Sequence, residues 1–298
     1  MIWLLIVLVA HCLNALVFIL TKVILEKLIS NEKVFAILIG GLGALAFIVA
    51  PWLLQVPSCF EFFINILAGA SFIFALYYLY LVLKKFDAST VVPISGATIP
   101  IVTLILAFVF LHERLGLTET VAFLLLVLGT VVITMAKDQK KFTAKAFMTT
   151  VWAGLLFAFS YFLTKYAFEI QDFWSAFIWM RAGSLLAAIV LIFDFDARND
   201  IVKLFKKLSW GKFFAFAGTM VLAALAFVLL NYAFSLGSVT LANALQGSQY
   251  VLLVGLVIIG GRLFPRLVKE KIEGLELIQK SAGIILIISG IAILASSL

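Results

Sequence analysis

The sequence predicts an all-α integral membrane protein with ten transmembrane helices in two inverted five-helix repeats. First, 65% of the 298 residues are hydrophobic, only 12% are charged, and the mean hydropathy is +1.22. Soluble domains carry about 25% charged residues. Second, apolar runs of about 20 residues, the length that crosses a bilayer, recur along the chain. Third, residue patterns in the first part return in the second. Composition therefore excludes a soluble protein.

Short polar turns separate the apolar runs, and we expect each run to form one span. Runs such as "FLLLVLGTVVI" are apolar on every side, as expected of a helix in lipid. The first run has no basic region before it and no small-residue cleavage site, so we expect it to remain as a span. The expected spans are residues 2–25, 34–54, 60–83, 89–111, 116–136, 146–168, 173–193, 213–236, 238–260 and 275–296.

Basic residues are concentrated in alternate loops. The loops after the first, third, fifth, seventh and ninth spans carry nearly all of the loop Lys and Arg, whereas the other loops carry only Arg114. The positive-inside rule then predicts a multi-pass protein of the plasma (cytoplasmic) membrane with both termini outside the cytoplasm. The net charge of +7 follows from topology, so we expect lipid and no nucleic acid as a partner.

The two halves share residues in the same order. "ILTKVILE" at residues 19–26 resembles "FLTKYAFE" at 162–169. Further along, residues of the third, fourth and fifth spans recur in the eighth, ninth and tenth, with Gly129 matching Gly290. We therefore expect repeats over 1–137 and 146–298. Five helices are an odd number, so the second repeat enters from the opposite face, an architecture that supports alternating access.

The stretch after the third span contains Pro93 and Pro100, then Glu113 and Arg114 in a short turn, then Gly129. Together with the repeated "TK", this pattern resembles the EamA-type members of the drug/metabolite transporter superfamily. The second repeat departs from it, with no proline in its fourth helix and the longer "GRLFPRLVKEKIEG" in place of "HERLGL". The resemblance implies a central cavity with the fifth and tenth helices packed outside it, and export or exchange of small metabolites.

Arg181 is the sharpest single candidate for substrate binding. It lies eight residues into its predicted span, about 12 Å along the axis, where a charge costs at least about 2.5–3.5 kcal/mol. Its planar fork suits a carboxylate or phosphate. The alternative, an arginine hydrogen-bonded to neighbouring helices, stays open.

A second group of candidates lies in "LANALQGSQYVLL". Asn243, Gln246 and Tyr250 share one helix face by their spacing, and either a cavity stripe or interhelical hydrogen bonds would explain them. His11 and Asn14 share a face of the first span, where packing is again the alternative. The remaining candidates for the lining are Tyr78, Ser95, Trp179 and Asn231.

Lys22 and Lys165 lie within about one turn of a helix end, so each is either a gate at one mouth of the pathway or a helix-end anchor whose stem reaches the headgroups. No Asp or Glu lies in the middle of a predicted span, which disfavours an intramembrane carboxylate relay. Cys12 and Cys59 are too few for a disulfide framework or a metal site, and we interpret both as packing residues.

We therefore predict a secondary transporter for an amino acid or related anionic or zwitterionic metabolite, with no catalytic residue, no metal and no cofactor. A membrane enzyme is the alternative: its only acidic cluster would be "DFDARND" at residues 194–200, which we interpret as a solvated loop. A non-transporting scaffold also stays open, as does assembly into a homo-oligomer.

Overall fold

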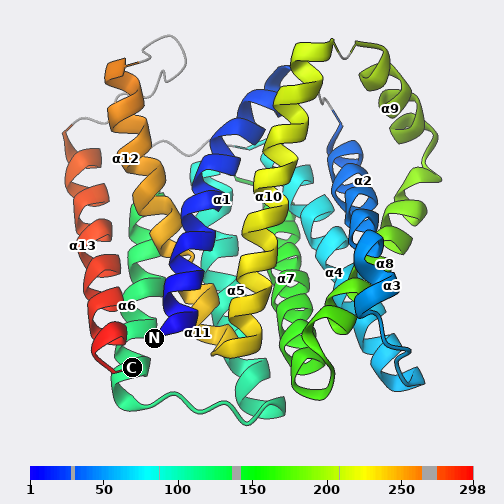
Figure 1. Ribbon diagram of the computed structural model, residues 1–298. Helices are drawn as coiled ribbons and strands as arrows, with labels where there is room; N and C mark the ends of the chain where they lie inside the picture. The colour runs from blue at the N-terminus through cyan, green and yellow to red at the C-terminus, as the bar shows by residue number, and fades with distance from the viewer. Residues whose placement is uncertain (28–30, 87, 136–141, 208, 264–273, 298) are drawn as a thin grey trace.

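The computed structural model describes residues 1–27, 31–86, 88–135, 142–207, 209–263 and 274–297, shown in Figure 1. Of these, the side chains of 22–27, 88, 89, 205, 207 and 257–263 also lie outside the described part. The described residues form helices and turns without a strand. Nine helices among them are long and apolar enough to cross a membrane, so the chain is a multi-pass, all-helical membrane protein.

The helices follow the expected spans closely, with differences at three places. In chain order they are α1 (Ile2–Lys27), α2 (Glu32–Leu42), the 3-10 helix η1 (Gly43–Val49), α3 (Ala50–Leu53), α4 (Cys59–Leu83), α5 (Ala88–Phe110), α6 (Leu117–Thr134), α7 (Ala144–Ile170), α8 (Phe173–Ile192), α9 (Phe195–Lys207), α10 (Trp210–Leu236), α11 (Val239–Ala244), α12 (Gly247–Leu263) and α13 (Leu275–Ser296).

The first difference is the expected ninth span, which is interrupted at Leu245 and Gln246 between α11 and α12. The second is the expected second span, whose middle tightens into η1 before the short α3, which has Pro51 in its first turn. Proline is favoured at the first turn of a helix because its missing N–H would have no partner there. The expected ninth span is therefore broken, whereas the expected second span remains one helical run, Glu32–Leu53, with a tightened middle.

The third difference is α9, where a solvated loop was expected. Ala197 and Leu204 are buried and Ile201 is half-buried, and this face packs against α2. Their spacing gives an amphipathic helix, so the interpretation of residues 194–200 as a loop is wrong for its helical part. The interpretation of Cys12 and Cys59 as packing residues is also wrong, because both are exposed free thiols.

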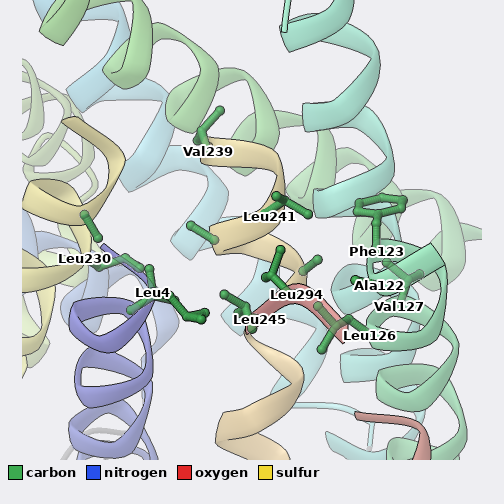
Figure 2. Close-up of a cluster of buried hydrophobic side chains, with 14 of the residues drawn as sticks. Leu4, Ala122, Phe123, Leu126, Val127, Leu230, Val239, Leu241, Leu245 and Leu294 are labelled. Atoms are coloured by element: carbon green, nitrogen blue, oxygen red, sulfur yellow. The ribbon is translucent and has the colours of Figure 1, made fainter. Parts of the chain in front are cut away.

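The helices form one bundle in which α6 and α13 lie side by side at one edge (Figure 1). Both termini lie at the same end of the bundle, and α9 lies at the other end. The N-terminal part of α1, together with α6, α10, α11 and α13, encloses a core of buried aliphatic side chains, among them Leu4, Leu126, Leu241 and Leu294 (Figure 2).

Glycines bring α6 and α13 into close contact. A methyl group at Gly129 would lie 2.7 Å from Ile287 and 3.0 Å from the carbonyl oxygen of Gly283. One at Gly290 would lie 2.9 Å from Leu126 and 3.1 Å from the carbonyl oxygen of Ala122. The residues that Gly129 meets lie three and seven positions before Gly290, and those that Gly290 meets lie three and seven positions before Gly129. The contacts of the two helices are therefore equivalent. Small residues allow such close approach in membranes.

An ion pair anchors the connection between α8 and α9 to α2. Lys33 Nζ donates to Asp194 Oδ2, and Asn31 Nδ2 donates to Asp200 Oδ2 at 3.0 Å. The hydrogen bond from Lys33 holds the pKa of the Asp194 carboxyl below its usual range. Because the folded state binds this proton less tightly than the unfolded chain, the pair stabilises the fold above the ordinary pKa of an aspartate.

Asp194→Asn is expected to lower Tm in detergent at pH 7 by roughly 1–3 °C, since partly exposed ion pairs contribute little. The difference from wild type should shrink as pH falls below the usual aspartate range, and also at high salt. Asp196→Asn, on an exposed side chain two residues away, is the control. Equal Tm values for the two variants at pH 7 would contradict a stabilising role for the pair.

Candidate functional site

Arg181 lies on α8 with 7% of its surface exposed, inside a group of aromatic rings. Its Cζ is 4.4 Å from the ring centre of Phe227, 5.3 Å from Phe177 and 5.9 Å from Phe72. These rings belong to α10, α8 and α4 respectively. Neither a carboxylate nor a carbonyl of the described residues accepts a hydrogen bond from the guanidinium, and Nε is buried without a partner.

Such an arrangement attracts a cation but leaves its hydrogen-bond donors free. A desolvated cation–π contact contributes about 2 kcal/mol, which compensates only partly for burying a charge without a counter-ion. A guanidinium has five N–H donors and no acceptor. An anion with two oxygens would satisfy the donors that the protein leaves unpaired.

The aromatic surroundings of Arg181 come from helices far apart in the sequence. Phe72 contacts Phe157 and Tyr161 on α7 as well as Phe227 on α10. Only Phe177, four residues before Arg181, could be placed beside it from helical spacing. The others were not predicted, because aromatic residues are common along the whole chain and none had a distinguishing neighbour.

Asn243 lies buried on α11, near the helix interruption. Its Nδ2 donates to Thr103 Oγ1 on α5 across 3.4 Å, a long bond. Gln246 is half-buried at the interruption, and Tyr250 is buried one turn beyond it. Gln249 is also buried beside them, although the sequence analysis did not single it out. Polar side chains thus gather around the broken helix.

Tyr161 on α7 connects the two groups of candidates. It packs against the core that contains Tyr250 and also against the aromatic cluster that contains Phe72 and Phe157. Its ring is stacked on Phe157 at 5.9 Å between centres. Tyr161 therefore lies between the core that contains Tyr250 and the aromatic cluster that contains Phe72.

Three of the other candidates make hydrogen bonds to backbone carbonyls. His11 Nε2 lies 3.2 Å from Ala242 O on α11, while its Nδ1 is buried without a partner among the described residues. Asn231 donates to Phe227 O at 2.8 Å, and Ser95 donates to carbonyls of its own helix. Asn14 is half-buried on α1. His11 thus ties α1 to the broken helix.

Trp179 and Tyr78 make contacts with residues other than Arg181. Trp179 donates from Nε1 to Gln55 O at 3.0 Å, and its ring contacts Phe62. Two residues along a helix turn a side chain by about 200°, so Trp179 and Arg181 point in nearly opposite directions. Tyr78 is half-buried on α4, and its ring lies 5.1 Å from that of Tyr77.

Of the two repeated lysines, only Lys165 has a described side chain; that of Lys22 lies outside the described residues. Lys165 Nζ lies 3.6 Å from Glu169 Oε1, one turn further along α7. Its side chain is 14% exposed. Within the described ranges, no group of three or more His, Cys, Asp or Glu side chains is arranged to hold a metal ion.

Comparison with known proteins gives a family and a fold. Residues 1–135 match the family described as the EamA-like transporter family. A solved structure described only as "Crystal structure of protein" is 17% identical to this chain, with a TM-score of 0.65 over 98% of this chain and 94% of that chain. No curated protein matches the chain.

The structural similarity extends over nearly the whole chain and shows a shared fold, while the family match covers the first part. That part includes Pro93, Pro100, Glu113, Arg114 and Gly129, the residues whose pattern suggested the family. Members of this family are membrane transporters. Residues 1–135 of the chain are therefore similar to the EamA-like transporter family, as the sequence pattern suggested.

Proposed function

We propose that the protein is a secondary transporter that exports a small anionic or zwitterionic metabolite by alternating access. The observation that carries the proposal is Arg181, a buried guanidinium held by three aromatic rings with no acceptor among the described residues. The substrate would supply a carboxylate or phosphate to this fork. A substrate that is also zwitterionic, such as an amino acid, would need neutral contacts for its remaining polar groups.

Those contacts would come from Asn243, Gln246, Tyr250 and Asn14. The first three surround the interruption between α11 and α12. Transporters commonly bind substrate at discontinuous helices, because the interruption frees backbone groups that a ligand can satisfy. Contact of His11 with Ala242 O would make α1 move together with this helix.

Ten spans in two inverted repeats, over 1–137 and 146–298, would provide the two states. The equivalent contacts of α6 and α13 support this arrangement. So do two other packed pairs, α4 with α7 and α10 with α1, because each joins the third span of one repeat to the first span of the other. Termini at the same end of the bundle agree with an even number of crossings (Figure 1).

Orientation in the plasma membrane is proposed from loop charge. The end that carries α9 and its lysines would face the cytoplasm, and the end that carries both termini would face outside. An enzyme or a scaffold would not move a solute across the membrane. A flux measurement therefore distinguishes both alternatives from a transporter.

Flux in proteoliposomes tests the proposal. Paired solutes that differ only at the anionic group, a carboxylate and its methyl ester, would be offered to vesicles with and without the protein. We expect protein-dependent flux of at least one carboxylate and at least about tenfold less flux of its ester, since losing a charged hydrogen bond costs about 1.5–3 kcal/mol. Equal flux of acid and ester would refute the anionic substrate, and chemical turnover without flux would indicate an enzyme.

A further inference from the structure

The turn between α5 and α6 meets the start of α11 at the end of the bundle that carries both termini (Figure 1). Ser238 Oγ donates a hydrogen bond to Glu113 Oε1. The same Ser238 Oγ accepts from Leu241 N at 2.9 Å, which makes it the N-cap of α11. Glu113 thus joins the first repeat to the part of the second that carries Asn243.

The end of α5 positions Glu113. Leu111 N and Glu113 N both donate to Ala107 O, at 3.0 and 3.1 Å. His112 between them has φ of 53°, in the left-handed region. These two bonds to one carbonyl, together with the left-handed His112, fix the direction in which the chain leaves α5. The Glu113 backbone is therefore held, and its half-buried side chain lies against α11.

The turn between α5 and α6 provides no cation close to the Glu113 carboxyl. Arg114 points away, with Cζ 5.9 Å from the ring centre of Phe108. Lys165 on α7 lies near enough to favour the ionised carboxyl, and Glu119 on α6 opposes it. Burial raises the pKa of the Glu113 carboxyl above its usual range, against the smaller lowering by the Ser238 hydrogen bond.

We propose that Glu113 is a proton-binding site that closes this end of the bundle, and that it releases its proton when the turn separates from α11 and the carboxylate becomes hydrated. A protonated carboxyl can still accept the hydrogen bond from Ser238, so the closed contact survives protonation. Separation would also draw α11 away from its position beside Thr103, to which Asn243 donates. The use of this contact in transport rests on the proposed alternating access.

The direction of the pH effect follows from linkage. A carboxyl that is buried in the closed state has a higher pKa there than in a hydrated open state, so the closed state binds the proton more tightly. Acid therefore favours the closed state. As pH rises from the ordinary glutamate range through the raised pKa, the open state is favoured, by up to about tenfold for each unit of difference in pKa.

Thiol labelling tests the site without a substrate. Asn243→Cys would be introduced into full-length protein with Cys12→Ser and Cys59→Ser. A membrane-impermeant maleimide would be applied from the face that carries both termini, between pH 5 and pH 8. Glu113→Gln imitates the protonated carboxyl and does not titrate. The labelling rate in this variant therefore gives the pH dependence that comes from ionisation of the thiol introduced by Asn243→Cys. Relative to Glu113→Gln, we expect the labelling rate with Glu113 to rise by about 3–10-fold across this range.

Matched variants separate the proton site from a structural role. Glu61→Gln removes a carboxylate that caps Ser58 N at 2.6 Å and does not act on Glu113, so it should keep the wild-type pH profile. Ser238→Ala should increase labelling at pH 5, whereas Ser235→Ala, which removes only a bond to Tyr232 O at 2.7 Å, should not. Size-exclusion profiles and Tm values at each pH would show which variants are folded.

An identical pH profile in Glu113→Gln and its parent would overturn the proposal, and so would faster labelling at acidic pH. Should Glu113→Gln fail to fold, an unchanged rate at pH 5 in Ser238→Ala would overturn it instead. The proposed function fails separately: absence of carboxylate flux together with a pH profile that depends on Glu113 would leave the proton site in place.

Discussion

Replacing Arg181 by methionine is expected to reduce transport by at least about tenfold while leaving the protein at least as stable as wild type. The guanidinium is buried with no acceptor among the described residues. Its removal would eliminate the desolvation cost of a charge, which exceeds what the aromatic contacts return. We expect the free energy of unfolding to stay the same or rise by about 1–2 kcal/mol, because apolar residues commonly replace buried ions without loss.

The transport defect should be large because the fork would provide the main contact to the substrate anion. Loss of charged hydrogen bonds worth about 1.5–3 kcal/mol reduces kcat/KM for flux by about 10–150-fold. Arg181→Lys should recover only part of this, since an ammonium keeps the charge but not the planar pair of donors. Flux in proteoliposomes and Tm in detergent would be measured for both variants.

Arg198→Met on α9 is the matched control, because Arg198 is exposed and lies at the bundle end opposite the termini. It should change neither flux nor Tm appreciably. A strong decrease of Tm in Arg181→Met would mean that the guanidinium supports the fold. Wild-type flux in folded Arg181→Met would eliminate the anion-binding role and leave the alternative interpretation of a structural arginine.

The second large effect is expected where α4 and α8 cross. A methyl group at Gly69 would lie 1.8 Å from Met180 O, and one at Gly183 would lie 2.3 Å from Ile66 O. Backbone atoms cannot move aside as side chains do, so Gly69→Ala and Gly183→Ala should each cost about 3 kcal/mol or more through separation of the helices. Because Met180 precedes Arg181, this separation would also displace the guanidinium.

Gly41→Ala and Gly218→Ala are the matched controls, since an added methyl group meets nothing within 4 Å at either position. Both should be neutral or stabilising by up to about 1 kcal/mol, because alanine restricts the unfolded chain more than glycine. The measurements are Tm and the monodisperse fraction in detergent. Similar values for Gly69→Ala and Gly41→Ala would show that the crossing can relax without cost.

The membrane class and most helix positions could be predicted from the sequence, because apolar length is a local property. In the membrane-spanning helices, the described acidic residues lie near helix ends as expected, for example Glu61 and Glu119 in first turns and Asp172 as an N-cap. Asp87, also expected at an end, lies outside the described residues. Arg181 could likewise be singled out, because a charged residue within an apolar run is recognisable from the sequence alone.

Helix α9 and the interruption of the ninth span were not predicted. The charged residues around Ala197, Ile201 and Leu204 masked a short apolar face, which becomes a helix face only because α2 covers it. Between α11 and α12 there is no proline, and the only local signal for a break is the pair Gly247 and Ser248. The interruption is tolerated because short-range bonds satisfy its backbone: Gln246 N donates to Asn243 O, and Ser248 N and Oγ donate to Leu245 O.

By itself the sequence determined that this chain crosses a membrane repeatedly and that its first part is similar to the EamA-like transporter family. Only the tertiary structure decided which buried polar groups have partners. Arg181 is surrounded by rings from three helices, and Glu113 meets Ser238 across 125 positions of sequence. The reason is physical: hydropathy depends on the segment alone, whereas the pairing of a buried donor depends on whichever helix packs beside it.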